Sequence, residues 1–311
     1  MAKPWTRLKK NSLALLNTPI PTTYRGRFAP SPSGPLHAGS ILAALASYLD
    51  AKAHHGSWFV RIEDLDPPRE SPAAAAAILH TLENLGLHWD GPVLYQSQRH
   101  AAYVEALQEL ISQHLVYACV CSRQTLTVSN FSYTGICRNL NLPLHTPAAL
   151  RCRVTDQKFL CNDRIQGQFM QRLEHDVGDF VIRRNDGLFA YQLAVVVDDA
   201  FQGITDVVRG IDLLDSTPRQ IYLQEQLGFT PPRYAHVPIL INSKGQKLGK
   251  QQYAKAIDNV FPAAELMAAL THRRQKPDPT LASANPAEIL AWAITHWDID
   301  KLKGIIQIPE N

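Results

Sequence analysis

The sequence predicts an α/β fold of the doubly wound type, in which helices cover both faces of a parallel sheet. Three observations support this prediction. A strand-like run at 24–29 leads through a loop rich in Pro, Ser and Gly into a segment with apolar residues at helical spacing. Strand-like and helical patterns then alternate up to about residue 115. With 311 residues and 45% apolar content, the chain can bury one large core or two unequal ones.

The loop after the first strand is a candidate phosphate site. His37 is predicted to lie in the first turn of the following helix, where unpaired backbone N–H groups and the positive end of the helix dipole attract phosphate. Gly34 and Gly39 allow a ligand to approach the backbone closely. The loop therefore indicates an ATP site, although loops of this composition also occur as plain connections.

The second strand, predicted at 57–62, is followed by the acidic residues Glu63, Asp64 and Asp66. Ligands of open parallel sheets lie at the carboxyl ends of the strands, so Glu63 is a candidate for holding an ammonium group. A solvated acidic loop is the alternative interpretation of the same cluster.

The remaining elements of the first half are predicted to be scaffold. Ser71 and Pro72 are expected to begin a helix that Gly86 ends, because Ser is favoured at the N-cap and Pro in the first turn. A short strand at 94–95 and a helix over about 98–115 complete the alternating pattern.

Cysteines concentrate in the next segment. Cys119, Cys121 and Cys137 fall within a short, irregular stretch that also holds Tyr133. Zinc is the natural occupant of such a thiolate group, because it accepts tetrahedral sites and closes loops too small for a core of their own. His145 is a candidate fourth ligand on spacing. Ordinary reduced thiols are the alternative.

Strand-like patterns return at 179–183 and 189–197, with a hairpin turn predicted at 185–187. Tyr191 is expected inside the second of these strands. Its side chain is predicted either to pack in the core or to point its hydroxyl into a cleft, where it could bind a carboxylate or an amide.

Two arginines are candidates for binding carboxylates. Arg209 is predicted to lie at a strand end, and Arg27 lies in the first strand. A guanidinium binds a carboxylate through two charge-assisted hydrogen bonds and stays charged at any relevant pH. Together with Glu63, these arginines fit an amino acid with two carboxylates and one ammonium group. Ion pairs within the scaffold are the alternative.

A polar loop at 243–251 carries Lys244, Lys247 and Lys250 among glycines. It is expected to be mobile, and in isolation it would be taken for a flexible basic surface loop. Helical patterns follow at 263–272 and 286–295.

The charge balance gives little direct information on partners. A net charge of +3 is too small to indicate nucleic-acid binding, so any RNA contact would need a local basic face. Residues 1–23 are basic and are expected to form a solvated tail. No apolar run reaches about 18 residues and no secretory signal is visible, so the cytoplasm is the expected location.

Five ordered motifs resemble the class I aminoacyl-tRNA synthetases of the glutamyl type. The first reads RFAPSPSGPLHAGS and ends at Ser40, where many class I enzymes have a second histidine. The others are RIEDLDPPR at 61–69, YQS at 95–97, VVRG at 207–210 and KLGKQ at 247–251. The resemblance covers about 24–255.

The resemblance implies a Rossmann-type nucleotide-binding fold with a zinc-containing insertion and a small C-terminal helical region. The implied parts are an N-terminal extension at 1–23, two halves of the catalytic domain at 24–116 and 173–255, a zinc-binding insertion at 117–172 that would meet the acceptor end of tRNA, and the C-terminal region at 256–311.

The resemblance also implies roles for individual residues. Glutamate binding falls on Arg27, Phe28, Ala29, Pro30, Ser31, Glu63, Tyr191 and Arg209. ATP binding falls on His37, Gly39, Ser40 and Lys250, and catalysis on His37, Lys247 and Lys250. One structural zinc ion falls on Cys119, Cys121, Tyr133 and Cys137. Gly249 stands where the family's lysine loop has a serine, a departure expected to loosen the closed loop.

Within this family, the chain is most similar to the short glutamyl-Q paralogues, because only 60 residues follow Gln251. They imply ATP-dependent activation of L-glutamate to glutamyl-adenylate, with Mg²⁺ accompanying ATP, and transfer to queuosine in the anticodon of tRNA(Asp) by a monomer. They are expected to activate glutamate without RNA, whereas full-length glutamyl enzymes generally need tRNA. The alternatives are a compact glutamyl-tRNA synthetase that charges the tRNA 3′ end and a non-catalytic zinc RNA-binding protein.

Overall fold

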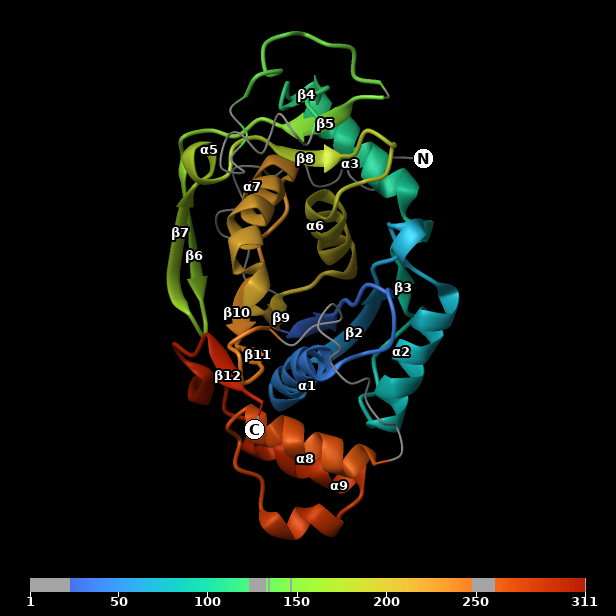
Figure 1. The fold of residues 1–311 in the computed structure, drawn as a ribbon, viewed down its shortest axis with the longest axis vertical. Helices are drawn as coiled ribbons and strands as arrows, with labels where there is room; N and C mark the ends of the chain where they lie inside the picture. Colours follow the sequence, from blue (N-terminus) through green and yellow to red (C-terminus); the bar gives the residue numbers. More distant parts are fainter. Residues whose placement is uncertain (1–22, 123–132, 134, 146, 248–260, 311) are drawn as a thin grey trace.

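The computed structural model describes residues 23–122, 133, 135–145, 147–247 and 261–310. Parallel strands lie at its centre, an antiparallel sheet at one end and a helical pair at the other (Figure 1). No helix within the described ranges is both long and apolar enough to span a bilayer.

The first parallel sheet follows the predicted alternation. Strand β1 (Arg25–Phe28) pairs in parallel with β2 (Ser57–Ile62), and β2 pairs in parallel with β3 (Leu94–Tyr95). Helices α1 (Ala38–Ala53), α2 (Pro72–Asn84) and α3 (His100–Ser112) follow these strands in turn. The Ser71 side chain caps α2 as predicted, by accepting from the Ala74 N–H.

A second parallel pair lies beside the first sheet. It consists of β9 (Asp206–Gly210) and β10 (Arg233–Val237). Thr205, just before β9, accepts from the backbone N–H of Arg25 through its hydroxyl and donates its own N–H to the Arg25 carbonyl. Residues at or just after the carboxyl ends of β1, β2, β9 and β10 lie around one cavity, so these four ends meet at one edge.

One predicted strand is wrong. Residues 189–197 were expected to be extended, but α6 (Tyr191–Gln202) begins at Tyr191. The expected turn at 185–187 is confirmed, with Gly187 at φ +91° and its N–H bonded to the Arg184 carbonyl. The run Leu193–Val197 is buried on every side of the helix, so its β-branched residues reflect tertiary packing rather than strand formation.

The segment after α3 is more regular than expected. Strands β4 (Val116–Cys119), β5 (Ala149–Cys152) and β8 (Phe180–Arg183) form an antiparallel sheet. Strands β6 (Lys158–Asp163) and β7 (Gly167–Arg172) form a long hairpin that the sequence analysis missed, followed by the short helix α5 (Leu173–Asp176). The hairpin runs along one side of the molecule from this sheet toward the C-terminal strands (Figure 1).

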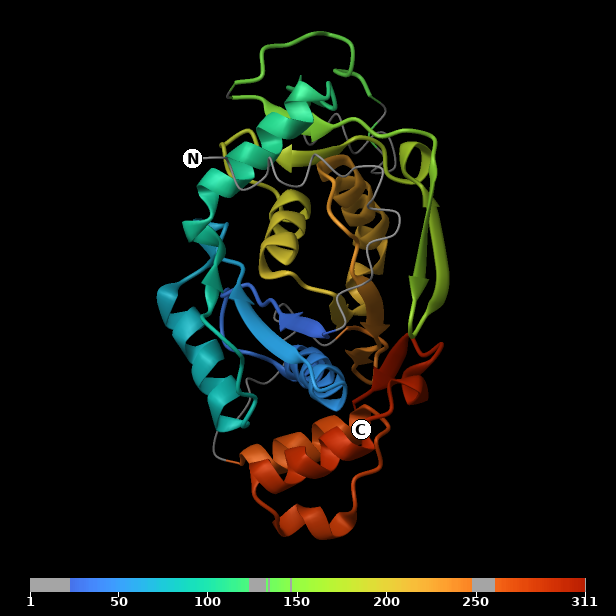
Figure 2. The ribbon, with the colours of Figure 1, turned by 180° about the vertical axis from the view of Figure 1, so that it is seen from behind.

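Helix α7 (Thr217–Leu227) connects β9 with β10 and packs against α6. Strand β11 (Ile239–Ile241) pairs in parallel with the C-terminal β12 (Gln307–Pro309). Helices α8 (Pro262–His272) and α9 (Pro286–His296) pack on each other and on α1, which lies between them and the first sheet (Figure 2).

Candidate active site

A cavity of about 500 Å³ opens at the carboxyl ends of β1, β2, β9 and β10, beside the start of α1. Ligands of parallel sheets bind at such an edge. Every described residue that the sequence analysis assigned to glutamate, ATP or catalysis lines it: Arg27, Phe28, Ala29, Pro30, Ser31, His37, Gly39, Ser40, Glu63, Tyr191, Arg209 and Lys247. Lys250 and Gly249 lie outside the described residues.

The α1 end of the cavity is built around His37. This residue is the N-cap of α1, one position before the first turn in which it was expected. Its Nδ1 accepts from the Ser40 N–H at 3.3 Å, and its Nε2 lies 3.1 Å from the Ser40 hydroxyl. A neutral imidazole with its proton on Nε2 satisfies both contacts, because Nε2–H can then donate to the Ser40 hydroxyl. Ser40 therefore fixes the orientation of the His37 ring.

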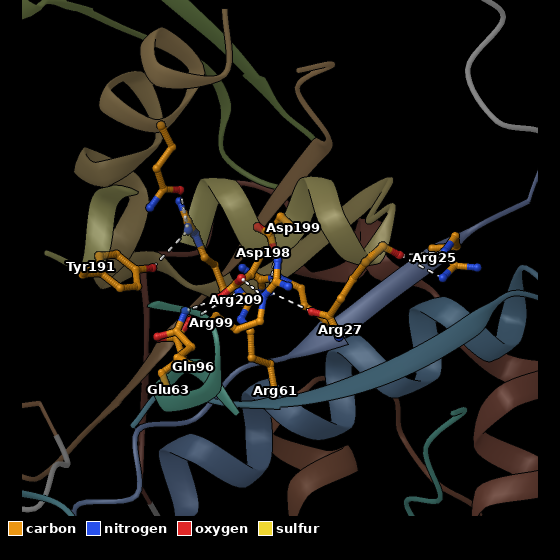
Figure 3. A network of polar contacts seen from close by, with 12 residues as sticks. Arg25, Arg27, Arg61, Glu63, Gln96, Arg99, Tyr191, Asp198, Asp199 and Arg209 are labelled. Carbon is orange, nitrogen blue, oxygen red and sulfur yellow. Dashed lines mark hydrogen bonds and ion pairs between the residues drawn. The ribbon is translucent and has the colours of Figure 1, made fainter. Parts of the chain in front are cut away.

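A network of buried charges reaches the cavity through Arg27 and Glu63 (Figure 3). Arg61 is fully buried and its guanidinium contacts Asp199 at 2.7 Å and Glu63 at 3.3 Å. Arg27 reaches the same Asp199 oxygen at 3.3 Å. Asp199 thus links two arginines, and Arg61 links Asp199 to Glu63.

Burial and ion pairing act against each other in this network. Burial raises the pKa of Glu63 above its ordinary value, even though Arg61 and Arg27 favour its charged form. Burial also acts to raise the pKa of Asp199, but the two guanidiniums outweigh it and hold that pKa below its ordinary value. The carboxylate of Asp199 therefore stays charged over the whole neutral range.

Arg209 is buried, and all five of its N–H donors have protein partners. The short contacts go from Nε to His236 Nε2 at 3.0 Å, from Nη1 to Gln220 Oε1 at 2.8 Å and from Nη2 to Thr217 Oγ1 at 2.8 Å. Longer ones reach the Tyr191 hydroxyl at 3.4 Å and the Leu213 carbonyl at 3.3 Å. A ligand carboxylate could replace the two long contacts while the short ones hold the guanidinium in place.

One of the quoted motifs, YQS at 95–97, supports the site from behind. Gln96 Nε2 donates to Asp198 at 2.9 Å, and Asp198 also accepts from Arg99 and Tyr103. These bonds fix α6 against α3 and so help to position Tyr191 at the start of α6, where its hydroxyl faces Arg209 (Figure 3).

Positive charge also lines the cavity from the C-terminal part of the chain. Lys247 Nζ contacts Asp212 at 2.6 Å at the rim, where both side chains are largely exposed. Arg273, at the end of α8, is 2% exposed and donates to the carbonyls of Leu42 and Pro238. Among the described residues no carboxylate pairs with Arg273, and burial lowers its pKa to about 9.

A cluster of sulfur atoms lies in the antiparallel part. The Sγ atoms of Cys119, Cys121 and Cys137 lie within 4.8 Å of one another and could hold a metal ion. The Tyr133 hydroxyl lies 3.5 Å from Cys119 Sγ and 4.0 Å from Cys121 Sγ, and accepts from the Cys137 N–H at 2.9 Å. His145 is exposed and is not part of this cluster.

The pKa values of Cys119 and Cys121 in this cluster shift in opposite directions. Burial raises the pKa of Cys121 to about 11, and the neighbouring Cys137 and Cys119 add to this effect. For Cys119, burial is outweighed by hydrogen bonds and by Arg151, so its pKa falls to about 7. A donor set of thiols around one phenol is chemically suited to a tetrahedral zinc ion.

Four buried groups near the site were not predicted from the sequence: Asp199, Asp163, His236 and Arg273. Asp199 lies two positions after the apolar run that ends at Val197, which is a usable signal for a buried acid. The other three carry no local signal, because their partners are distant in sequence; Asp163 and His236 are 73 positions apart.

Comparison with known proteins agrees with this geometry. The family model of class I tRNA synthetases (E and Q), catalytic domain, matches residues 23–264. A glutamyl-Q tRNA(Asp) synthetase of Pseudomonas fluorescens is 53% identical over 93% of this chain and 97% of its own length. Another, from Ectopseudomonas mendocina, is 56% identical over 89% of this chain and 94% of its own length.

Solved structures agree as well. A glutamate-tRNA synthetase from Elizabethkingia anophelis has a TM-score of 0.77 and 25% identity, and the match covers 92% of this chain and 68% of that one. A glutamate tRNA ligase from Elizabethkingia meningosepticum, in complex with its amino acid, has a TM-score of 0.76 and 26% identity over 92% of this chain and 67% of that one. This chain is a ligase with a mixed α/β class I catalytic fold, and it belongs to the glutamyl-Q tRNA(Asp) synthetase family of class I tRNA synthetases.

Proposed function

We propose that this chain activates L-glutamate with ATP to glutamyl-adenylate and transfers the glutamyl group to queuosine in the anticodon of tRNA(Asp). The observation that carries the proposal is the set of charges that meets in the cavity, together with its place at the carboxyl ends of the parallel strands. In this proposal the parallel strands and their helices are a Rossmann-type nucleotide-binding fold.

Charge balance supports glutamate as the amino acid. Arg27, Arg61 and Arg209 carry three positive charges, and Glu63 and Asp199 carry two negative ones. This network is left with one positive charge, which matches the net charge of glutamate, and Arg273 adds a further positive charge to the lining of the cavity. Glutamine would leave a buried charge badly paired, which costs about 1–3 kcal/mol. We assign the ammonium group to Glu63 and the carboxylates to Arg27 and Arg209, with Tyr191 beside them and the backbone of 28–31 as the floor.

His37, Gly39 and Ser40, at the start of α1, are assigned to ATP, since helix N-termini favour phosphate. Lys247 and Lys250 are assigned to the charge that develops on the phosphates. Mg²⁺ bound with ATP neutralises the phosphate oxygens. A glutamate α-carboxylate oxygen attacks the α-phosphorus, the bond to the bridging oxygen breaks, and pyrophosphate leaves.

In the second step a hydroxyl of queuosine attacks the activated carbonyl carbon, loses its proton and displaces AMP. No residue of the chain needs to form a covalent intermediate. The queuosine acceptor is supported by relatives named glutamyl-Q tRNA(Asp) synthetase that match nearly their whole length. We propose that the chain acts as a monomer in the cytoplasm, where its tRNA is found.

We assign one structural zinc ion to Cys119, Cys121, Cys137 and Tyr133. The clustering of the three Sγ atoms and the Tyr133 hydroxyl supports this set over one with His145. Zinc would supply a fixed tetrahedral link between β4 and the residues around 137, a stretch with a very small core of its own.

The test of this function is exchange of labelled pyrophosphate into ATP with glutamate and without RNA. We expect exchange with glutamate and much less with glutamine. A second candidate, charging of the tRNA 3′ end, is favoured by the likeness to solved glutamate-tRNA synthetases and predicts exchange only after tRNA is added. No exchange under either condition would contradict both and favour a non-catalytic RNA-binding protein.

A further inference from the structure

Arg209 is fixed from behind by a buried histidine. His236, on β10, is completely buried, and its Nε2 is 3.0 Å from Arg209 Nε and 3.3 Å from the Thr217 hydroxyl. A guanidinium has donors and no acceptor. His236 Nε2 must therefore carry a lone pair toward Arg209, and the imidazole must be neutral with its single proton on Nδ1.

A buried carboxylate lies on the other side of this imidazole. His236 Nδ1 is 2.6 Å from Asp163 Oδ2, so the Nδ1–H donates to the carboxylate. The second oxygen of Asp163 accepts from the backbone N–H groups of Ile165, Gln166 and His236. These bonds fix Asp163 as an acceptor toward Nδ1, which selects the tautomer that Arg209 requires.

The protonation states agree with this geometry. Burial acts to raise the pKa of Asp163, but its bonds to His236 and the backbone hold that pKa below its ordinary value. Burial and the nearby Arg209 and Arg27 lower the pKa of His236, although Asp163 opposes this shift. A charged carboxylate facing a neutral imidazole is the only arrangement in which every hydrogen bond of the Asp163–His236–Arg209 chain has one donor and one acceptor.

Asp163 comes from a distant part of the molecule. It is the last residue of β6, at the tip of the β6–β7 hairpin. Gln166, in the same tip, donates to the carbonyls of His236 and Ile305, and the Arg164 N–H donates to the Tyr234 carbonyl. The hairpin tip is thus bonded both to β10 and to the chain before β12.

We propose that Asp163 and His236 are positioning residues that hold the Arg209 guanidinium in the orientation that binds a glutamate carboxylate, so that the tip of the β6–β7 hairpin sets the affinity for the amino acid. This inference rests on the proposed function of Arg209. Neither residue lines the cavity, so both act through Arg209 and not on substrate.

The central variant is Asp163→Asn in the full-length protein with its metal. The amide oxygen can keep the backbone bonds, but its NH₂ group would face Nδ1 and drive the histidine proton to Nε2, against Arg209. We expect the KM for glutamate in pyrophosphate exchange to rise about tenfold or more, since a hydrogen bond from a charged donor is lost. The KM for ATP should stay unchanged. Asp156→Asn, at an exposed acid that contacts His175, is the matched control and should change neither constant.

Two further variants keep the proposal testable if Asp163→Asn fails to fold. The amide oxygen in His236→Gln can accept from Arg209 Nε, whereas His236→Leu offers no acceptor. We expect His236→Gln to bind glutamate about tenfold more tightly than His236→Leu at similar thermal stability. Equal affinity in the two variants would contradict the proposal.

A readout without substrate separates this inference from the proposed function. Nitrogen NMR of the unliganded protein should show His236 with a protonated Nδ1 and an unprotonated Nε2, and the reverse in Asp163→Asn. If the wild-type protein shows this tautomer but no glutamate-dependent pyrophosphate exchange, the proposed function is wrong while the Asp163–His236–Arg209 hydrogen bonds are confirmed. The opposite tautomer, or an equal rise of KM for glutamate and ATP in Asp163→Asn, would overturn the positioning role.

Discussion

The cavity and the cysteine cluster hold their polar groups in different ways. In the cavity, protein groups satisfy one another: Asp199 pairs with two arginines, and Arg209 has five protein partners. In the cluster, three sulfur atoms lie within 4.8 Å of one another beside the Tyr133 hydroxyl, which accepts from the Cys137 N–H. The cavity is therefore preorganised without a ligand, whereas the cluster presents donor atoms that could hold a metal ion.

This difference separates the two regions experimentally. Changes in the cavity should alter the kinetics of glutamate and ATP with small effects on metal content. Changes in the cluster should alter metal content and transfer to RNA, while pyrophosphate exchange is largely kept. A variant that changed both the metal content and the kinetics of glutamate and ATP to the same extent would contradict this separation of the two regions.

The largest effect is expected for Arg209→Lys. An ammonium group keeps the charge but cannot reproduce the guanidinium fork or its three short contacts. We expect kcat/KM for glutamate to fall by about 100-fold, measured by pyrophosphate exchange, with zinc content unchanged. Arg172→Lys, at an exposed ion pair with Asp156, is the matched control. A fall of similar size in the control would count against a specific role.

Loss of the metal is expected to have the second-largest effect. Cys137→Ala is expected to lose one equivalent of zinc and to lower transfer of glutamate to tRNA about tenfold, because the cluster no longer fixes this part of the chain. Zinc is measured by elemental analysis and transfer with labelled glutamate. Cys161→Ala, at a buried thiol outside the cluster, should keep its zinc. Full zinc content in Cys137→Ala would refute the assignment.

Tyr133→Phe sharpens the same assignment. It removes the phenol oxygen and leaves the ring under Arg151, whose guanidinium lies 3.8 Å from the ring centroid. We expect zinc affinity to fall about tenfold in a chelator competition. Tyr222→Phe, at a buried tyrosine outside the cluster whose hydroxyl donates to the Arg153 carbonyl, is the control and should bind zinc as the wild type does. Equal affinities in both variants would remove Tyr133 from the ligand set.

Arg273→Met tests whether the C-terminal part contributes to the cavity. Its buried guanidinium has no carboxylate partner among the described residues and is available to favour an anionic ligand. We expect the KM for ATP to rise about fivefold and the KM for glutamate to stay unchanged. The neighbouring, exposed Arg274 gives the control variant Arg274→Met. A drop in thermal stability with no change in KM for ATP would show a purely structural role.

The smallest effect concerns pH. Burial raises the pKa of Glu63 above 4.5, and only its charged form can hold an ammonium group. The KM for glutamate should therefore rise as the pH falls toward that raised pKa, while Asp199, whose pKa is lowered, stays charged. The side-chain carboxylate of the substrate has a pKa of about 4.3 and also titrates in this range. Because Glu63→Gln retains only the titration of the substrate, the difference between the two pH profiles reports the titration of Glu63. Parallel profiles in the two proteins would contradict the role of Glu63.

The residues that line the cavity could be predicted from sequence because they lie in local motifs at strand ends. Arg27 and Phe28 end β1, residues 29–31 follow it, and Glu63 follows β2, so each position could be assigned from a neighbouring strand alone. The same holds for the cysteines, which are close in sequence.

What supports these residues could not be predicted in the same way. His236 and Asp163 belong to different strands and meet only through tertiary packing. Tyr191 was expected in a strand because Val195–Val197 favour extended structure locally, but complete burial allows the same run to form α6. Arg61 and Asp199 add one charge of each sign, so they change the ion pairing of Glu63 and Arg27 but not the net charge of this network.

The most direct test of the proposed function is the position of the glutamyl group on RNA. Labelled glutamate, ATP and the full-length protein are incubated with tRNA(Asp) that either carries or lacks queuosine, and the label is mapped by nuclease digestion. We predict label in the anticodon-loop fragment of the queuosine-containing tRNA and none on the other. Label at the 3′ end, or equal labelling of both tRNAs, would contradict the account.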